Sequence, residues 1–218
     1  MTEAEWMACD DAQPMLDFLE GKASQRKLRL FASACCRQVW RWVTDEDLQA
    51  AVEVAERFAD SAATARQLKT AERKAAAITS DLGLDASVAT RMSEWAIRDA
   101  ADAVSHLARK QLSPQGVARL TRSAIAATPD KPKDQAVILR DIFGNPFRPV
   151  ALDPSWLTST VVALAEGIYA ERTFDRLPIL ADALQDAGCE NPDVLDHCRG
   201  PGPHVRGCFV VDLLTGRN

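Results

Sequence analysis

Apolar side chains recur every three or four positions along most of this chain, and that spacing limits what it can fold into. The segment that starts at Ser24 is the clearest case. Its apolar stripe consists of Leu28, Phe31, Ala32, Cys35, Val39 and Trp42. Steps of three and four place side chains on one face of an α-helix, whereas a half-buried strand needs strict alternation. The stripe therefore predicts a long helix with this face in the core.

Residues typical of helix ends divide the rest of the chain into further helices. Ser24 and Thr44 are predicted N-caps, and Asn191-Pro192 is a cap followed by a residue suited to the first turn. The last apolar run, from Cys208 to Leu214, fits a buried helix or a buried strand, and we favour the helix from its context. We predict an all-α protein, a multi-helix bundle or irregular helical array of about eight to ten helices.

The division into domains rests on one polar segment. The stretch Thr128-Pro129-Asp130-Lys131-Pro132-Lys133 has two prolines, three charges and no apolar side chain. Such a composition is typical of a linker. We therefore predict an N-terminal helical domain over 1–127, a linker over 128–134, and a C-terminal helical lobe over 135–218 that packs on the first domain.

Charge and hydropathy exclude several classes of protein. The 218 residues are 47% hydrophobic and 26% charged, which is ordinary for a globular protein, and the net charge is −5. An acidic chain disfavours nucleic acid as a partner, because nucleic-acid binders carry an excess of Lys and Arg. The N-terminus lacks the pattern of a secretory signal, and no apolar run is long enough to span a membrane. The sequence predicts a cytoplasmic protein that does not bind a membrane.

Three motifs carry a resemblance to a known group of proteins. They are Lys22-Ala23-Ser24 with Arg26-Lys27-Leu28-Arg29-Leu30-Phe31 and Cys35-Cys36-Arg37, then Ile142-Phe143-Gly144-Asn145-Pro146-Phe147-Arg148-Pro149-Val150, and Gly202-Pro203-His204-Val205-Arg206-Gly207-Cys208. In these motifs the chain resembles an uncharacterised family abundant in planctomycete bacteria. The resemblance implies a cytoplasmic bacterial protein, and it implies no activity.

Soft and borderline metal ligands gather near the C-terminus. The candidate ligands are Cys189, His197, Cys198, His204 and Cys208. In a reducing compartment cysteines are thiols or metal ligands rather than structural disulfides, and zinc takes four such ligands. The spacing matches no common zinc finger, so small buried thiols and a hydrogen-bonded histidine explain the pattern better than a zinc site does. If the segment is helical, His204 and Cys208 share one face.

The same residues also suggest a thiol nucleophile. Cys208 would be activated by His204, with Asp182 or Asp212 orienting the imidazole. A nucleophilic thiolate needs an exposed, electropositive setting, whereas Cys208 precedes an apolar run that favours its burial. We assign no catalytic residue from the sequence.

Two loops form a candidate binding surface. Its residues are Asn145, Phe147, Arg148, His204 and Arg206, from two turns rich in Pro and Gly. Rigid turns of this kind either fix angles between helices or present a binding surface. The basic face Arg26, Lys27, Arg29, Arg37 and Arg41 is predicted to be solvated and paired with acids such as Asp45, Glu46 and Asp47; the alternative is contact with a phosphate backbone.

Taken together, these patterns favour a non-catalytic protein-interaction or regulatory module. The alternatives are a small zinc-stabilised domain that binds a protein or nucleic acid, and a cysteine-dependent enzyme. We expect a protein partner and no organic cofactor, with zinc as the candidate metal, and the oligomeric state stays open.

Overall fold

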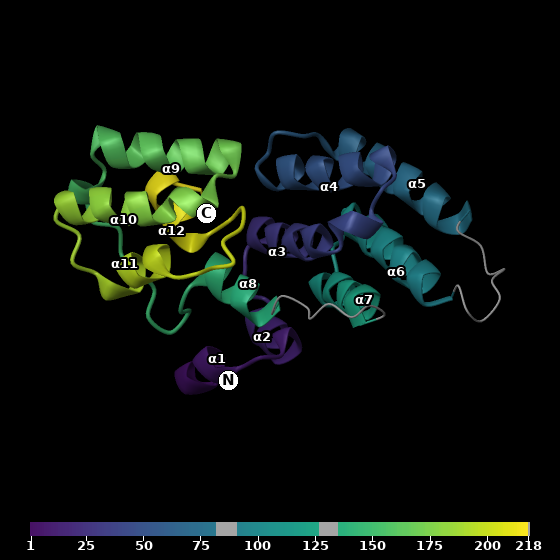
Figure 1. Cartoon of the computed structure of the whole chain (residues 1–218), viewed down its shortest axis with the longest axis horizontal. Coiled ribbons are helices and arrows are strands. Elements are labelled where there is room, and N and C mark those ends of the chain that lie inside the picture. The colour runs from purple at the N-terminus through teal and green to yellow at the C-terminus, as the bar shows by residue number, and fades with distance from the viewer. Residues whose placement is uncertain (82–90, 127–134, 218) are drawn as a thin grey trace. The chain divides into compact units, whose positions relative to one another are not determined.

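The computed structural model describes residues 1–81, 91–126 and 135–217, with the side chains of 91–95 left aside. These residues form twelve α-helices and three short 3-10 helices, and none of them forms a strand (Figure 1). The prediction of an all-α helical array is confirmed. The helices outnumber the predicted eight to ten because several elements of six to nine residues stand between turns. No described helix is long and apolar enough to cross a membrane.

The chain forms two compact units. Unit 1 consists of Met1–Asp10 with Ala136–Asn218, and unit 2 consists of Asp11–Gln135. Unit 2 holds α2 (Ala12–Leu19), α3 (Gln25–Gln38), η1 (Trp40–Trp42), α4 (Glu46–Ala59), α5 (Ala65–Asp81), α6 (Arg91–Leu107) and α7 (Pro114–Ala126). Unit 1 holds α1 (Glu3–Ala8), α8 (Gln135–Phe143), η2 (Pro154–Trp156), α9 (Ser159–Glu171), η3 (Phe174–Arg176), α10 (Leu177–Asp186), α11 (Pro192–Arg199) and α12 (Phe209–Thr215).

In these units the first ten residues belong with the C-terminal part, whereas the sequence analysis placed them in the N-terminal domain. The indole Nε1 of Trp6 donates to the carbonyl of Gly144 at 3.1 Å, and the Trp6 side chain is fully buried. Arg140 donates to the carbonyls of Trp6 and Cys9 at 3.1 and 2.8 Å, and so satisfies the C-terminal end of α1. The predicted linker over 128–134 lies outside the described residues.

Helix α3 is the central helix of unit 2. It contacts α4, α6 and α7, and it buries every residue from Arg29 to Cys36. The apolar stripe predicted for this helix is largely buried, but Leu28 and Trp42 are only half-buried. The helix also ends earlier than the stripe suggests, because residues Trp40–Trp42 tighten into the 3-10 helix η1.

The basic face of α3 is paired rather than freely solvated. Arg37 binds Glu56 through two hydrogen bonds of 2.7 and 2.9 Å, and Arg26 donates to Asp60 at 3.0 Å. Arg29 is buried and binds backbone carbonyls. The expected partners at the start of α4 have other roles, since Asp45 caps that helix. The pairing uses Glu56, in the last turn of α4, and Asp60, the residue that follows this helix.

A separate core holds the C-terminal helices of unit 1 together. Helix α9 packs against α10 and α12, and α10 packs against α11. The buried side chains include Ile168, Leu180, Leu184, Cys198 and Val211. The last apolar run forms α12, so the choice of helix over strand is confirmed. This core fixes the two helices, α11 and α12, that position the site described next.

Candidate metal centre

Four potential metal ligands converge inside unit 1. The carboxylate of Asp141, the rings of His197 and His204, and the thiol of Cys208 each present one ligand atom, and these atoms all lie within 4.8 Å of one another. His204 Nδ1 is 2.7 Å and His197 Nε2 is 3.1 Å from Asp141 Oδ1. His197 Nε2 is also 3.2 Å from Cys208 Sγ. The set combines one oxygen, two nitrogens and one sulfur.

Three helices and one connection deliver these side chains. Asp141 lies in the last turn of α8, His197 lies in α11, and Cys208 is the N-cap of α12. His204 comes from the connection between α11 and α12, which is not helical, so His204 and Cys208 do not share a helical face as predicted. They meet because this connection folds back. Gly202 has φ of +74°, and a Cβ there would lie 2.8 Å from the backbone nitrogen of His204.

The hydrogen bonds around His204 fix its orientation. Nε2 lies 3.3 Å from the carbonyl of Gly200, and a carbonyl only accepts, so this nitrogen carries a proton. Nδ1, which faces Asp141, is then the ring atom available as a ligand. The backbone N–H of Val205 donates to the other carboxylate oxygen of Asp141 at 2.9 Å. Such outer contacts are typical of metal sites, where they set the tautomer and the ligand orientation.

In the ion-free protein the cluster is a buried polar network. Burial raises the pKa of Asp141, but hydrogen bonds from His197 and His204 outweigh it and hold that pKa below its usual value. Burial lowers the pKa of His204, while the hydrogen bond and negative charge of Asp141 raise it more. Burial, with Asp141 nearby, raises the pKa of the Cys208 thiol well above its ordinary value. Without a cation, therefore, the thiol is neutral and Asp141 is charged.

The spacing of the ligand atoms suits a small tetrahedral ion. Ligand atoms about 2.0–2.3 Å from a tetrahedral zinc lie about 3.3–3.6 Å from one another. Three of the six separations between ligand atoms, 2.7, 3.1 and 3.2 Å, are slightly shorter than this, and all six lie within 4.8 Å, so the side chains must adjust to hold such an ion. Mixed thiolate, imidazole and carboxylate ligands favour zinc or a related transition metal over calcium or magnesium.

The structure brings together three of the five ligands predicted from the sequence and adds one. His197, His204 and Cys208 belong to the cluster, whereas Cys189 and Cys198 are buried thiols outside it. Burial raises the pKa of Cys198 to about 12, in keeping with a small core side chain. Asp141 is the ligand that the sequence did not indicate, because it lies 56 or more residues before the others and has no distinctive spacing to them.

The geometry does not match the thiol nucleophile considered from the sequence. His197, and not His204, contacts Cys208, and Asp182 binds Arg199 at 2.8 Å instead of orienting an imidazole. His197 presents the same nitrogen, Nε2, to the thiol and to Asp141, whereas a catalytic histidine uses one nitrogen for each partner. The thiol is also fully buried.

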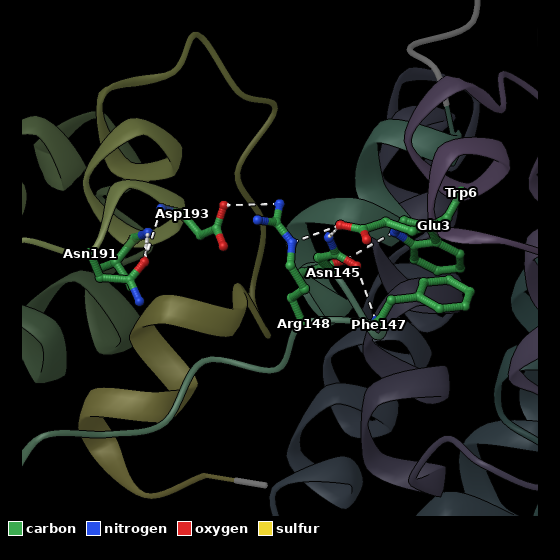
Figure 2. A network of polar contacts seen from close by, with 9 residues as sticks. Glu3, Trp6, Asn145, Phe147, Arg148, Asn191 and Asp193 are labelled. Carbon is green, nitrogen blue, oxygen red and sulfur yellow. Dashed lines mark hydrogen bonds and ion pairs between the residues drawn. The ribbon is translucent and has the colours of Figure 1, made fainter.

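Most residues of the candidate binding surface predicted from two loops make hydrogen bonds, ion pairs or ring contacts within unit 1. Figure 2 shows the first loop: Asn145 Nδ2 and Arg148 Nε each donate to Glu3 Oε1 at 2.7 Å, and Arg148 also lies 3.7 Å from Asp193. Asn145 additionally accepts from the backbone N–H of Phe147. The hydrogen bond from Asn145 is the main cause that lowers the pKa of Glu3. These contacts connect α1, the loop after α8, and α11.

The second loop is engaged in the same way. His204 belongs to the metal cluster, and the guanidinium of Arg206 lies 4.5 Å from the centre of the Tyr169 ring. Arg217 lies 4.3 Å from the same ring centre. Of the five predicted surface residues, Phe147 is the large apolar one that stays exposed, at 36%. The loops thus fix the positions of helices.

Comparisons with known proteins do not identify a relative of this chain. Scans against protein-family models, curated proteins and solved structures each find no match to the chain. The cluster of Asp141, His197, His204 and Cys208 is therefore interpreted from its own chemistry.

Proposed function

We propose that this protein is a non-catalytic helical module that binds a protein partner and whose unit 1 is stabilised by one zinc ion. The observation that carries the proposal is the convergence of Asp141, His197, His204 and Cys208 with all ligand atoms within 4.8 Å. Four protein ligands complete a tetrahedron and leave no open position for a substrate, as in structural rather than catalytic zinc sites. Asp141 and Cys208 are buried, which supports the same interpretation.

Zinc would connect parts of unit 1 that few other contacts join. The ligands come from α8, α11, the connection after α11, and the start of α12. A metal that binds the folded state and not the unfolded chain adds about 2.7 kcal/mol of stability when its concentration is a hundred times its dissociation constant. Zinc would also lower the pKa of the Cys208 thiol and bind it as thiolate.

The location of the exposed apolar side chains supports the proposal of a protein partner. Among the described residues the exposed large hydrophobic side chains are those of Met7, Phe147, Leu157 and Ile179, and all four belong to unit 1. Large contiguous apolar patches mark surfaces that contact other proteins, and these four side chains are the candidates for such a patch. Unit 1 is thus both the metal-binding unit and the proposed contact unit.

The test uses two cysteine variants that are matched in burial. We expect elemental analysis of the purified protein to find one zinc per chain in the wild type and in Cys198→Ser, and none in Cys208→Ser. Cobalt-loaded wild type should show thiolate-to-metal charge transfer, which Cys208→Ser should lack. A partner protein should bind the wild type and Cys198→Ser but not Cys208→Ser.

Two results would contradict this proposal. Wild-type protein that stays free of transition metal after purification and after incubation with excess zinc would remove the metal centre. Loss of the ion in Cys198→Ser with retention in Cys208→Ser would show that Cys198, and not Cys208, is a ligand. Because both thiols are fully buried, a general loss of folding should affect the two variants alike.

A further inference from the structure

A groove lies between two antiparallel helices of unit 2. Helices α4 and α5 pack side by side, and the open groove between them has a volume of about 340 Å³. Its floor is made by small apolar side chains, with Ala51 and Val54 from α4 and Ala71 from α5. This volume lies within the range of about 300–1,000 Å³ that small-molecule pockets have.

The charges along this groove are unequal at its two ends. At the end where the chain passes from α4 to α5, Arg57 and Arg66 line the groove, and both are exposed. In the described part of the chain neither arginine makes an ion pair. At the opposite end Lys74 binds Asp47 at 2.7 Å, so that pair is already neutralised. The groove is therefore apolar along its floor and cationic at one end.

We propose that the groove binds a small organic anion: a carboxylate attached to an apolar body. The carboxylate would lie between Arg57 and Arg66, because guanidinium groups bind carboxylates through paired hydrogen bonds. The apolar body would lie along Val54, Ala51 and Ala71 toward the Asp47–Lys74 pair. This site is in unit 2 and involves none of the metal ligands, so it goes beyond the proposed function and stands independently of it.

The observations favour a small anion over a macromolecule. A nucleic acid needs several cations that follow its backbone, whereas this groove has two unpaired cations at one end and an ion pair at the other. A peptide helix would need apolar anchors over two or more turns of its own length, and the groove volume of about 340 Å³ is small for that.

Octanoate is the probe for this test, measured by calorimetry on the full-length protein. We expect octanoate to bind with about one-to-one stoichiometry. Acetate, which lacks the apolar body, and 1-octanol, which lacks the carboxylate, should each bind at least about tenfold more weakly. Arg57→Gln and Arg66→Gln should each weaken octanoate binding about tenfold or more. The matched control is Arg73→Gln, an exposed arginine of α5 that does not line the groove.

A second variant tests the apolar floor without disturbing the core. Ala50 lines the groove and is exposed, so Ala50→Phe should fill the groove, abolish octanoate binding and leave the unfolding midpoint close to that of the wild type. The proposal is overturned if octanoate fails to bind at millimolar concentration, if 1-octanol binds as well as octanoate, or if Arg73→Gln weakens binding as much as Arg57→Gln. Binding of an acidic amphipathic peptide without binding of octanoate would overturn it in favour of a peptide site.

Discussion

The exposure of Arg29 differs from its prediction. Arg29 lies in a run of basic residues predicted to face solvent, yet it is only 3% exposed. Its guanidinium donates to the carbonyls of Leu107, Arg109 and Lys110 at 2.6, 3.0 and 3.2 Å. These carbonyls lie at and just beyond the C-terminal end of α6, where helical hydrogen bonding stops and a cation is favourable. Burial lowers the pKa of Arg29. The three carbonyl acceptors replace hydrogen bonds to water that the guanidinium loses on burial.

Replacing this arginine should therefore destabilise unit 2. We expect Arg29→Met to lower the free energy of unfolding by about 2–4 kcal/mol, because it leaves carbonyls at the end of α6 without donors. Urea unfolding followed by circular dichroism measures the change. Arg73→Met, at an exposed position, should change stability by less than about 0.5 kcal/mol. Equal effects of the two substitutions would contradict a capping role for Arg29.

At the level of single residues, the sequence indicated which residue types could bind a metal better than it indicated which of them lie close together. It placed His197, His204 and Cys208 among the candidate ligands because soft ligands are rare and clustered there. It could not identify Asp141, since carboxylates are common and this one approaches the histidines only after α8, α11 and α12 have packed. For the same reason it could not separate Cys208 from Cys198, a buried thiol ten positions earlier in the chain.

At the level of elements, helical spacing and capping residues predicted most helices, and the errors lie at their ends. The N-cap of α4 was predicted at Thr44, but the structure has Asp45 there, with its carboxylate accepting from the amides of Asp47 and Leu48 at 2.9 and 3.2 Å. Thr and Asp are both good N-caps, so the sequence alone does not decide between neighbours. The 3-10 turn after α3 shifts the start of α4 by one residue.

This difference gives a direct test of where α4 begins. Asp45→Ala should cost about 1 kcal/mol of unfolding free energy, because it removes the acceptor for two free amides and a negative charge at the positive end of the helix. Thr44→Ala should change stability by less than about 0.5 kcal/mol, since Thr44 is exposed and does not cap the helix. Thermal unfolding of both variants measures the effect. The reverse order of the two values would support the sequence-based cap.

At the level of the whole molecule, two units with separate cores should respond differently to removal of the metal. Chelation should speed amide hydrogen exchange in α8, α11 and α12, which carry or adjoin the ligands, by an amount equivalent to about 2.7 kcal/mol if the ion is a hundredfold above its dissociation constant. Exchange in α3, α4 and α7 should stay unchanged. Mass spectrometry of peptic fragments measures both sets. Faster exchange throughout, or in neither set, would contradict a metal that stabilises unit 1.

Composition and periodicity were sufficient to predict the fold class, because an all-helical array follows from local spacing. They were not sufficient to assign the first ten residues, because only the tertiary contacts of α1 decide which unit it joins. Trp6 shows this: its ring is fully buried and its indole donates to Gly144, which lies 138 positions further along the chain. The capping box formed by Thr2 and Glu5 explains why α1 forms, but it does not indicate which part of the protein α1 packs against.

The long sequence separation between Trp6 and Gly144 has a consequence for synthesis of the protein. Translation at about 5–20 residues per second separates the synthesis of Trp6 from that of Gly144 by roughly 7–28 s. All residues of unit 2 are synthesised in that interval. The nascent chain thus carries the indole of Trp6 before its docking site exists, so this ring cannot be buried against Gly144 until synthesis has passed that residue.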